Sequence, residues 1–120
     1  MKTMKLKMSE GWFRAGEVGV DSGHMILVDP CYVSGGCDTD SCYEATTDDA
    51  TGCGLGHPYQ ALTEGSGMVT QTGIGDGVYP VYVCRRDMAG WGERNVAMIV
   101  DYGSHIMLEE DCQTFELEDN

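Results

Sequence analysis

Four side chains of the kinds that bind zinc fall close together in the sequence. They are Cys37, Cys42, Cys53 and His57. Three thiolates and one imidazole complete the tetrahedral coordination of a structural Zn²⁺ ion, and such an ion would order a polar segment that has no core of its own. The sequence therefore offers a zinc site here, and it names no other cofactor as strongly.

The spacing of these residues leaves other interpretations open. The pattern Cys-x4-Cys-x10-Cys-x3-His lacks the closely spaced Cys-x2-Cys pair of most zinc sites, and Cys31 is an alternative ligand. The same cysteines can equally be reduced thiols, some of them packed as small apolar side chains. Asp38 and Asp40 begin like a calcium loop, but Tyr43 stands where that loop needs glycine.

A second group of residues suits an anionic ligand. Arg85, Arg86 and Arg94 cluster around Trp91, and arginine together with tryptophan can hold a phosphate or a nucleobase. We expect such a ligand to lie between segments 29–32 and 75–79. The alternative is that the arginines balance neighbouring carboxylates on a turn. The residues predicted to contact the ligand are Asp29, Cys31, Tyr32, Asp76, Tyr79, Arg85 and Arg86.

Signatures of catalysis are weak in this sequence. Residues 73–77 read Gly-Ile-Gly-Asp-Gly and lack the Lys-Ser/Thr that completes a P-loop, so a tight hairpin turn is the simpler interpretation. A catalytic pair of Cys31 or Cys84 with a histidine needs the two groups within hydrogen-bond reach, which no local signature indicates. We therefore favour a binding protein over an enzyme.

Short β-strands are expected to position these residues. Strand-forming residues gather in 17–20, 24–29, 67–72, 78–84, 94–102, 105–108 and 114–118, whereas no window has the sustained apolar period of a helix. The turns at 21–23 and 73–77 predict two hairpins, each between the strands that flank the turn. Within 78–84, Val81 and Val83 would face the core if Tyr82 faces solvent.

This pattern predicts a mainly β fold, a small antiparallel sandwich or barrel. The length of 120 residues fits a single domain over residues 1–120. Within it we expect a basic N-terminal segment at 1–9, a long acidic loop at 34–58 and an acidic C-terminal segment at 109–120.

The charge excludes several classes of partner. Twenty acids against seven bases give a formal net charge of −13, which opposes direct binding to nucleic acid or anionic lipid. The longest apolar run is far shorter than the roughly 20 residues that cross a bilayer. The N-terminus begins with lysines but lacks the apolar core of a signal peptide. We therefore expect a cytoplasmic protein with reduced thiols and no membrane contact.

Three stretches carry a resemblance. They are Val20–Tyr32, which ends in Asp-Pro-Cys-Tyr, then Cys42–Ala45, and Thr72–Val81, which reads Thr-Gly-Ile-Gly-Asp-Gly-Val-Tyr-Pro-Val. They resemble an uncharacterised family of small proteins from bacteriophages and bacteria. The resemblance spans residues 17–86 and implies a soluble, phage-encoded protein in which the two longer motifs lie close in space. It carries no activity, and Cys37 and Cys53 lie outside its motifs.

Taken together, these observations predict an acidic binding protein in the cytoplasm of the host cell, which inhibits or sequesters a host protein. One alternative is a binder or hydrolase of a small nucleotide-like anion. A further alternative is a zinc-stabilised structural module. The sequence leaves the oligomeric state open.

Overall fold

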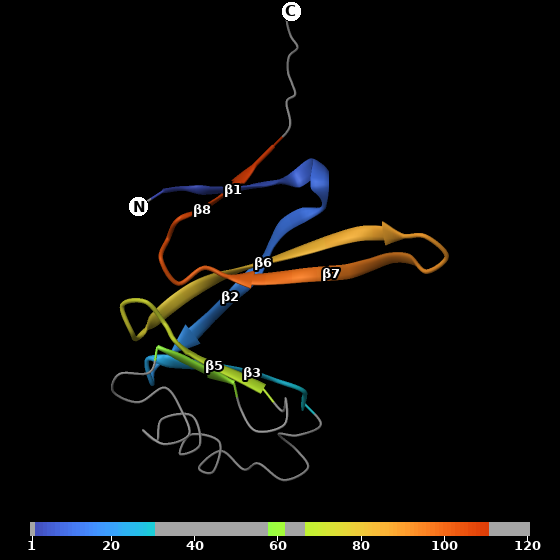
Figure 1. Ribbon diagram of the computed structural model, residues 1–120. Helices are drawn as coiled ribbons and strands as arrows, with labels where there is room; N and C mark the ends of the chain where they lie inside the picture. Colours follow the sequence, from blue (N-terminus) through green and yellow to red (C-terminus); the bar gives the residue numbers. More distant parts are fainter. Residues whose placement is uncertain (1, 31–57, 62–66, 111–120) are drawn as a thin grey trace, which may run out of the picture. The chain divides into compact units, whose positions relative to one another are not determined.

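The computed structural model describes residues 2–30, 58–61 and 67–110. Strands account for 66% of the described residues, so the prediction of a mainly β fold is confirmed. A 3₁₀ turn, η1 (Met8–Glu10), follows the first strand (Figure 1). In chain order the strands are β1 (Met4–Lys7), β2 (Trp12–Val20), β3 (His24–Val28), β4 (Tyr59–Ala61), β5 (Gly67–Gln71), β6 (Gly77–Met88), β7 (Gly92–Val100) and β8 (Ile106–Glu109).

These strands form three small open sheets, with the orders β1-β8, β2-β6-β7 and β3-β5-β4. The pairs β6–β7, β3–β5 and β4–β5 are antiparallel, as expected, whereas β1 and β8 run parallel. Each order has two ends, so none of these sheets closes on itself. The described strands therefore fit the sandwich alternative rather than the barrel.

Contacts along the chain divide it into two compact units. The first unit comprises Met1–Gly19 and Val78–Asn120, and the second comprises Val20–Gly77. The sheets β1-β8 and β2-β6-β7 belong to the first unit apart from the end residues Val20 and Gly77, and the sheet β3-β5-β4 belongs to the second. The expectation of a single domain over residues 1–120 stays a prediction.

The strand pairing of the two predicted hairpins was wrong. β2 and β3 flank the turn at 21–23, yet β2 pairs with β6 and β3 pairs with β5. β5 and β6 likewise flank the turn at 73–77 and join different sheets. Turn residues set the local backbone path, but the partner of a strand depends on which apolar faces can be buried together. The turn at 21–23 bonds instead to Thr72, the residue that follows β5, whose N–H donates to the Gly23 carbonyl oxygen at 3.0 Å.

The core of the first unit is concentrated on β6, where Tyr79, Tyr82 and Cys84 are buried. Tyr82 therefore faces inward. Val81 and Val83, which take the core positions only if Tyr82 is exposed, are half-buried. The larger aromatic side chain removes more apolar surface from water than valine does, and this favours the observed face.

Parts of several predictions lie outside the described residues. These are positions 34–57 of the acidic loop, positions 111–120 of the acidic C-terminal segment and the strand expected at 114–118. In the part of the chain that the structure describes, no helix has the length and hydropathy needed to cross a membrane.

Candidate functional site

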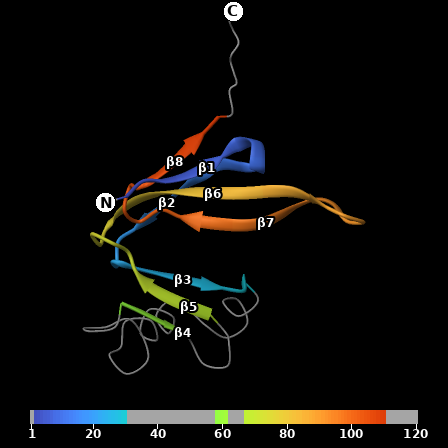
Figure 2. The ribbon, with the colours of Figure 1, turned by 45° about the horizontal axis from the view of Figure 1, so that its top comes forward.

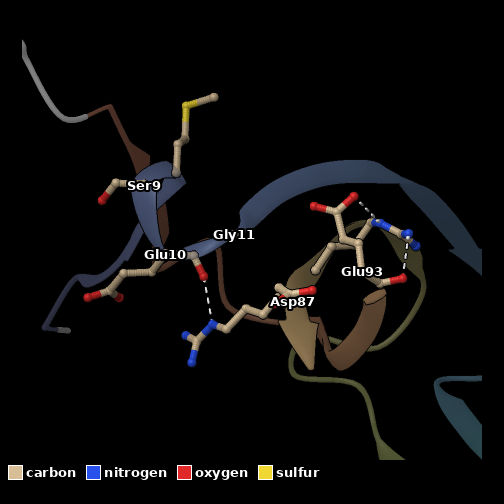
Figure 3. Close-up of a pocket in the computed structure, with 8 residues that line it drawn as sticks. Ser9, Glu10, Gly11, Asp87 and Glu93 are labelled. Atoms are coloured by element: carbon tan, nitrogen blue, oxygen red, sulfur yellow. Dashed lines mark hydrogen bonds and ion pairs between the residues drawn. The ribbon is translucent and has the colours of Figure 1, made fainter. Parts of the chain in front are cut away.

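A shallow depression of about 520 Å³ lies on the first unit, at the junction of η1 with the outer part of the β6–β7 hairpin (Figure 3). Gly11 ends η1 with a positive φ of 101°, and its N–H donates to the Met8 carbonyl oxygen at 3.0 Å. The Gly11 carbonyl oxygen then accepts the Arg85 N–H at 2.9 Å, which fixes η1 against β6. The depression is lined by Met8, Ser9, Glu10, Gly11, Arg85, Arg86, Asp87 and Glu93.

The Arg85 side chain in this depression is engaged by the neighbouring strand. A bulge between Cys84 and Arg85 shifts the register of β6 and places Arg85 opposite Asn95. Its Nη1 donates to Asn95 Oδ1 at 2.6 Å and its Nη2 donates to the Glu93 carbonyl oxygen at 3.3 Å. The Nε atom also lies 3.6 Å from the Glu93 carboxylate. Arg85 therefore braces the hairpin, as expected if the arginines balance neighbouring carboxylates.

Arg86 and Arg94 also contact the backbone of this unit. Arg86 Nε donates to the Glu10 carbonyl oxygen at 2.7 Å, a bond visible between the sticks in Figure 3. Arg94 Nε donates to the Trp91 carbonyl oxygen at 2.9 Å, and its guanidinium carbon lies 5.9 Å from the centre of the Trp91 ring. The cation–π contact that the sequence suggested for a ligand is thus made within the protein.

The charge balance of the depression does not favour an anion. Its lining includes two arginines and three carboxylates, Glu10, Asp87 and Glu93. Glu93 lies within ion-pair distance of Arg85, and Asp87 follows Arg86 directly in the chain, so these carboxylates lower the positive potential that an anionic ligand would meet. The structure brings Arg85 and Arg86 together in one depression, but it surrounds them with negative charge.

The variant Arg86→Ala tests whether an anion binds in this depression, with little expected loss of stability. The variant loses one exposed hydrogen bond to Glu10, so we expect the free energy of unfolding to fall by less than about 1 kcal/mol. Urea denaturation followed by tryptophan fluorescence measures this change. A phosphate titration followed by NMR tests the anion. If an anion binds here, the backbone amide signals next to position 86 shift in the wild type and stay unchanged in the variant. Equal shifts in both proteins would place the anion elsewhere.

The other residues predicted to contact the anion are divided between the two units. Asp29 follows β3 and Asp76 lies in the turn after β5; both are exposed and belong to the second unit. Tyr79 belongs to the first unit, where it is buried and packs edge-on against Tyr102 with the ring centres 5.6 Å apart. Cys31 and Tyr32 lie outside the described residues.

The predicted zinc ligands also lie outside the described residues. These are Cys37, Cys42, Cys53 and His57. Within residues 2–30, 58–61 and 67–110, no three side chains from histidine, cysteine, aspartate and glutamate come together in a group that could hold a metal ion. The zinc site stays a prediction about the 31–57 segment.

Asp101, a buried acid of the first unit with several hydrogen bonds, was not singled out in the sequence. Asp101 is 1% exposed and follows β7. Its Oδ1 accepts the backbone N–H of Gly103 at 3.0 Å, the backbone N–H of His105 at 3.3 Å and a hydrogen bond with His105 Nδ1 at 2.8 Å. Its Oδ2 accepts the Ile106 N–H at 2.8 Å. An aspartate followed two residues later by glycine is the local signal, because aspartate side chains commonly bond the backbone of a turn.

The electrostatics of Asp101 follow from these bonds. Burial by itself raises the pKa of Asp101, but the backbone N–H groups of Ile106, Gly103 and His105 outweigh it, with help from the His105 ring, and the pKa is lowered. The carboxylate therefore holds the β7–β8 connection in its folded path. This connection leads directly into β8, which pairs in parallel with β1. At the start of that pairing the Met4 N–H donates to the His105 carbonyl oxygen at 2.7 Å.

An aspartate–histidine pair could also serve a nucleophile, but the buried thiol of this unit is engaged elsewhere. Cys84 is 1% exposed, and its S–H donates to the Glu10 carbonyl oxygen at 3.3 Å. A catalytic thiol needs a base within hydrogen-bond reach and access for its substrate. The hydrogen bonds of the Asp101–His105 pair hold the β7–β8 connection together.

Basic and acidic residues are distributed very unequally between the two units. All seven lysines and arginines lie in the first unit, which also carries eleven of the twenty acids. The second unit has nine acids and no lysine or arginine, a formal charge of −9 within Val20–Gly77. No carboxylate of that unit can form an ion pair with a lysine or arginine of the same unit, so the unit by itself carries a strong negative field.

Comparison with protein-family models, curated proteins and solved structures finds no match to this chain.

Proposed function

We propose that this protein is a non-catalytic binding module that contacts a basic protein partner through its second unit. The observation that carries the proposal is the formal charge of −9 without a single lysine or arginine in Val20–Gly77. Such a field attracts cationic surfaces, speeds their association and repels anionic ones. Two observations on the described residues add no support for catalysis. The Cys84 thiol is buried and bonded to the Glu10 carbonyl oxygen, and no three metal-binding side chains among those residues come together.

The resemblance to small bacteriophage and bacterial proteins supports a host protein as the partner. In that setting the binding module would inhibit or sequester a host factor by covering its basic surface. The resemblance concerns the motifs Val20–Tyr32 and Thr72–Val81, and both lie largely in the acidic unit. The proposed role thus concerns the part of the chain that the resemblance covers.

Charge-neutralised variants test this proposal with decalysine as the probe. The double variant Asp21→Asn, Asp76→Asn removes two exposed acids of the second unit, and the matched control Asp87→Asn, Glu110→Gln removes two exposed acids of the first unit. We expect the first pair to weaken decalysine binding at low salt by about fivefold and the control pair to weaken it less, because each exposed charge pair contributes roughly 0.2–1 kcal/mol.

Isothermal titration calorimetry at two salt concentrations provides the measurement. Because exposed charges are screened within about 8 Å at physiological ionic strength, raising the salt is expected to weaken the wild-type interaction strongly. Equal losses in the two double variants would contradict the assignment to the second unit. Affinity that does not change with salt would contradict a charge-driven partner altogether.

A further inference from the structure

One face of the β3-β5-β4 sheet is lined by apolar side chains. Leu27 of β3 pairs with Met68 of β5, which in turn pairs with Ala61 of β4. The next row on the same face consists of Met25, Thr70 and Tyr59, because residues opposite each other across a sheet share a face and alternate residues along a strand return to it. Figure 2 shows the three strands side by side. We call Leu27, Tyr59, Ala61 and Met68 the apolar face.

The apolar face is open to solvent, whereas the centre of the opposite face is covered. Leu27 is 64% exposed, Tyr59 68% and Met68 39%. On the opposite face, Val69 is fully buried and its cross-strand partner Ile26 is half-buried. The sheet therefore packs against the protein on one side, and the apolar face on its other side remains exposed to solvent. A contiguous exposed apolar patch of this kind marks an interaction surface more often than isolated exposed residues do.

The net charge of the unit that carries the apolar face points to one class of occupant. The unit that carries it has nine acids and no lysine or arginine, and Asp29 follows β3 directly, on an exposed position next to Val28. We propose that the apolar face docks a cationic, amphipathic segment of a protein partner, whose apolar side chains lie on the sheet and whose lysines or arginines are attracted by the net negative charge of the unit. This inference rests on the proposed function and names the surface and the partner chemistry.

A second copy of the chain fits this surface less well than a cationic segment. Two copies docked face to face would bring two units of charge −9 together, and like charges placed opposite each other cost free energy. A cationic segment gains twice, since the apolar face excludes water while the net negative charge of the unit steers the approach. The few side chains of the apolar face suit a weak interaction rather than a permanent one.

Two peptides with the same charge separate the apolar contribution from the electrostatic one. The first ten-residue peptide alternates lysine with leucine, and the second alternates lysine with serine. We expect the wild-type protein to bind the lysine–leucine peptide about tenfold more tightly, because only this peptide can bury leucine side chains on the apolar face. Fluorescence anisotropy of labelled peptides at low salt measures both affinities.

Substitutions then assign the difference to this face. The double variant Leu27→Ser, Met68→Ser is expected to bind both peptides equally, at the affinity of the lysine–serine peptide. Ile74→Ser is the matched control, because Ile74 is 90% exposed and belongs to the same unit but lies in the turn after β5 rather than on the sheet. This control is expected to keep the tenfold preference. Circular dichroism confirms that each variant retains its strands.

The outcomes separate this inference from the proposed function. If the wild type binds both peptides equally and salt-dependently, the charge-driven function stands and the apolar face is not the docking surface. If neither peptide binds at low salt, the proposed function itself fails. If sedimentation shows that the wild type self-associates and Leu27→Ser, Met68→Ser does not, a second copy covers the face and the inference is overturned.

Discussion

Gly11→Ala is expected to reduce the free energy of unfolding by about 3 kcal/mol or more, one of the two largest effects of any single substitution that we propose. Gly11 has a φ of 101°, where a side chain is strained. A Cβ at this position would also overlap the Arg85 carbonyl oxygen of β6. Because that oxygen belongs to the backbone of a central strand, relief requires η1 to move away from β6 and lengthens the hydrogen bond between Arg85 N–H and the Gly11 carbonyl oxygen.

Two other glycines separate the sources of this effect. Gly90→Ala places a side chain at a φ of 85° with open space around it, so it carries the backbone strain alone, about 1 kcal/mol. Gly16→Ala meets neither restriction, and we expect little change or a slight stabilisation. Urea denaturation of the three variants gives the ranking. A Gly11→Ala variant no less stable than Gly90→Ala would show that η1 is not fixed closely against β6.

The strands were the most predictable part of the fold. The segments rich in valine, isoleucine and tyrosine at 78–84 and 94–102 became the cores of β6 and β7, and these pair as antiparallel neighbours. Local composition is enough for such strands because strand-forming side chains prefer the extended backbone wherever the strand is placed. The charged end of β6 beyond Cys84 was not expected to be a strand, because its residues carry no strand pattern. It is extended because it pairs with β7.

Strand partners were less predictable than strand positions. The turns at 21–23 and 73–77 looked like hairpin turns, but each connects strands of different sheets. β1 was missed although Met4 and Leu6 alternate with Lys5 and Lys7, because four alternating residues are too short a signal on their own and the strand is completed by parallel pairing with β8. Parallel pairing joins residues far apart in the sequence, and no local signal specifies it.

The candidate site divides in the same way. The clustering of Arg85 and Arg86 was visible in the sequence, and the structure places both at one depression. Their engagement by Asn95 and by the Glu10 carbonyl oxygen was not visible, because it depends on a bulge and on a contact between η1 and β6. The apolar face likewise needed the register of three strands before alternating residues could be assigned to one side.

Asp101→Asn is expected to be the second severely destabilising substitution, with a loss of about 3 kcal/mol at neutral pH. The wild-type carboxylate accepts four hydrogen bonds, from the N–H groups of Gly103, His105 and Ile106 and from the His105 ring. An asparagine has one acceptor oxygen and an NH₂ group that would face donors, so buried N–H groups lose their partner. Asp87→Asn, which changes an exposed aspartate of the same unit, serves as the control and is expected to alter stability by less than about 0.5 kcal/mol.

The pH dependence of this loss identifies the carboxylate charge as its cause. Because the pKa of Asp101 is lowered in the folded protein, the unfolded chain takes up the proton first as the pH falls. The stability that the charge contributes is therefore complete above the ordinary aspartate range, declines from about pH 5 downward, and is lost as the pH passes the folded pKa. Denaturation of wild type and Asp101→Asn at several pH values should show a gap that is constant near neutrality and narrows in acid, whereas the Asp87→Asn gap stays small throughout. A gap that did not narrow would assign the loss to altered packing of the β7–β8 connection rather than to the charge.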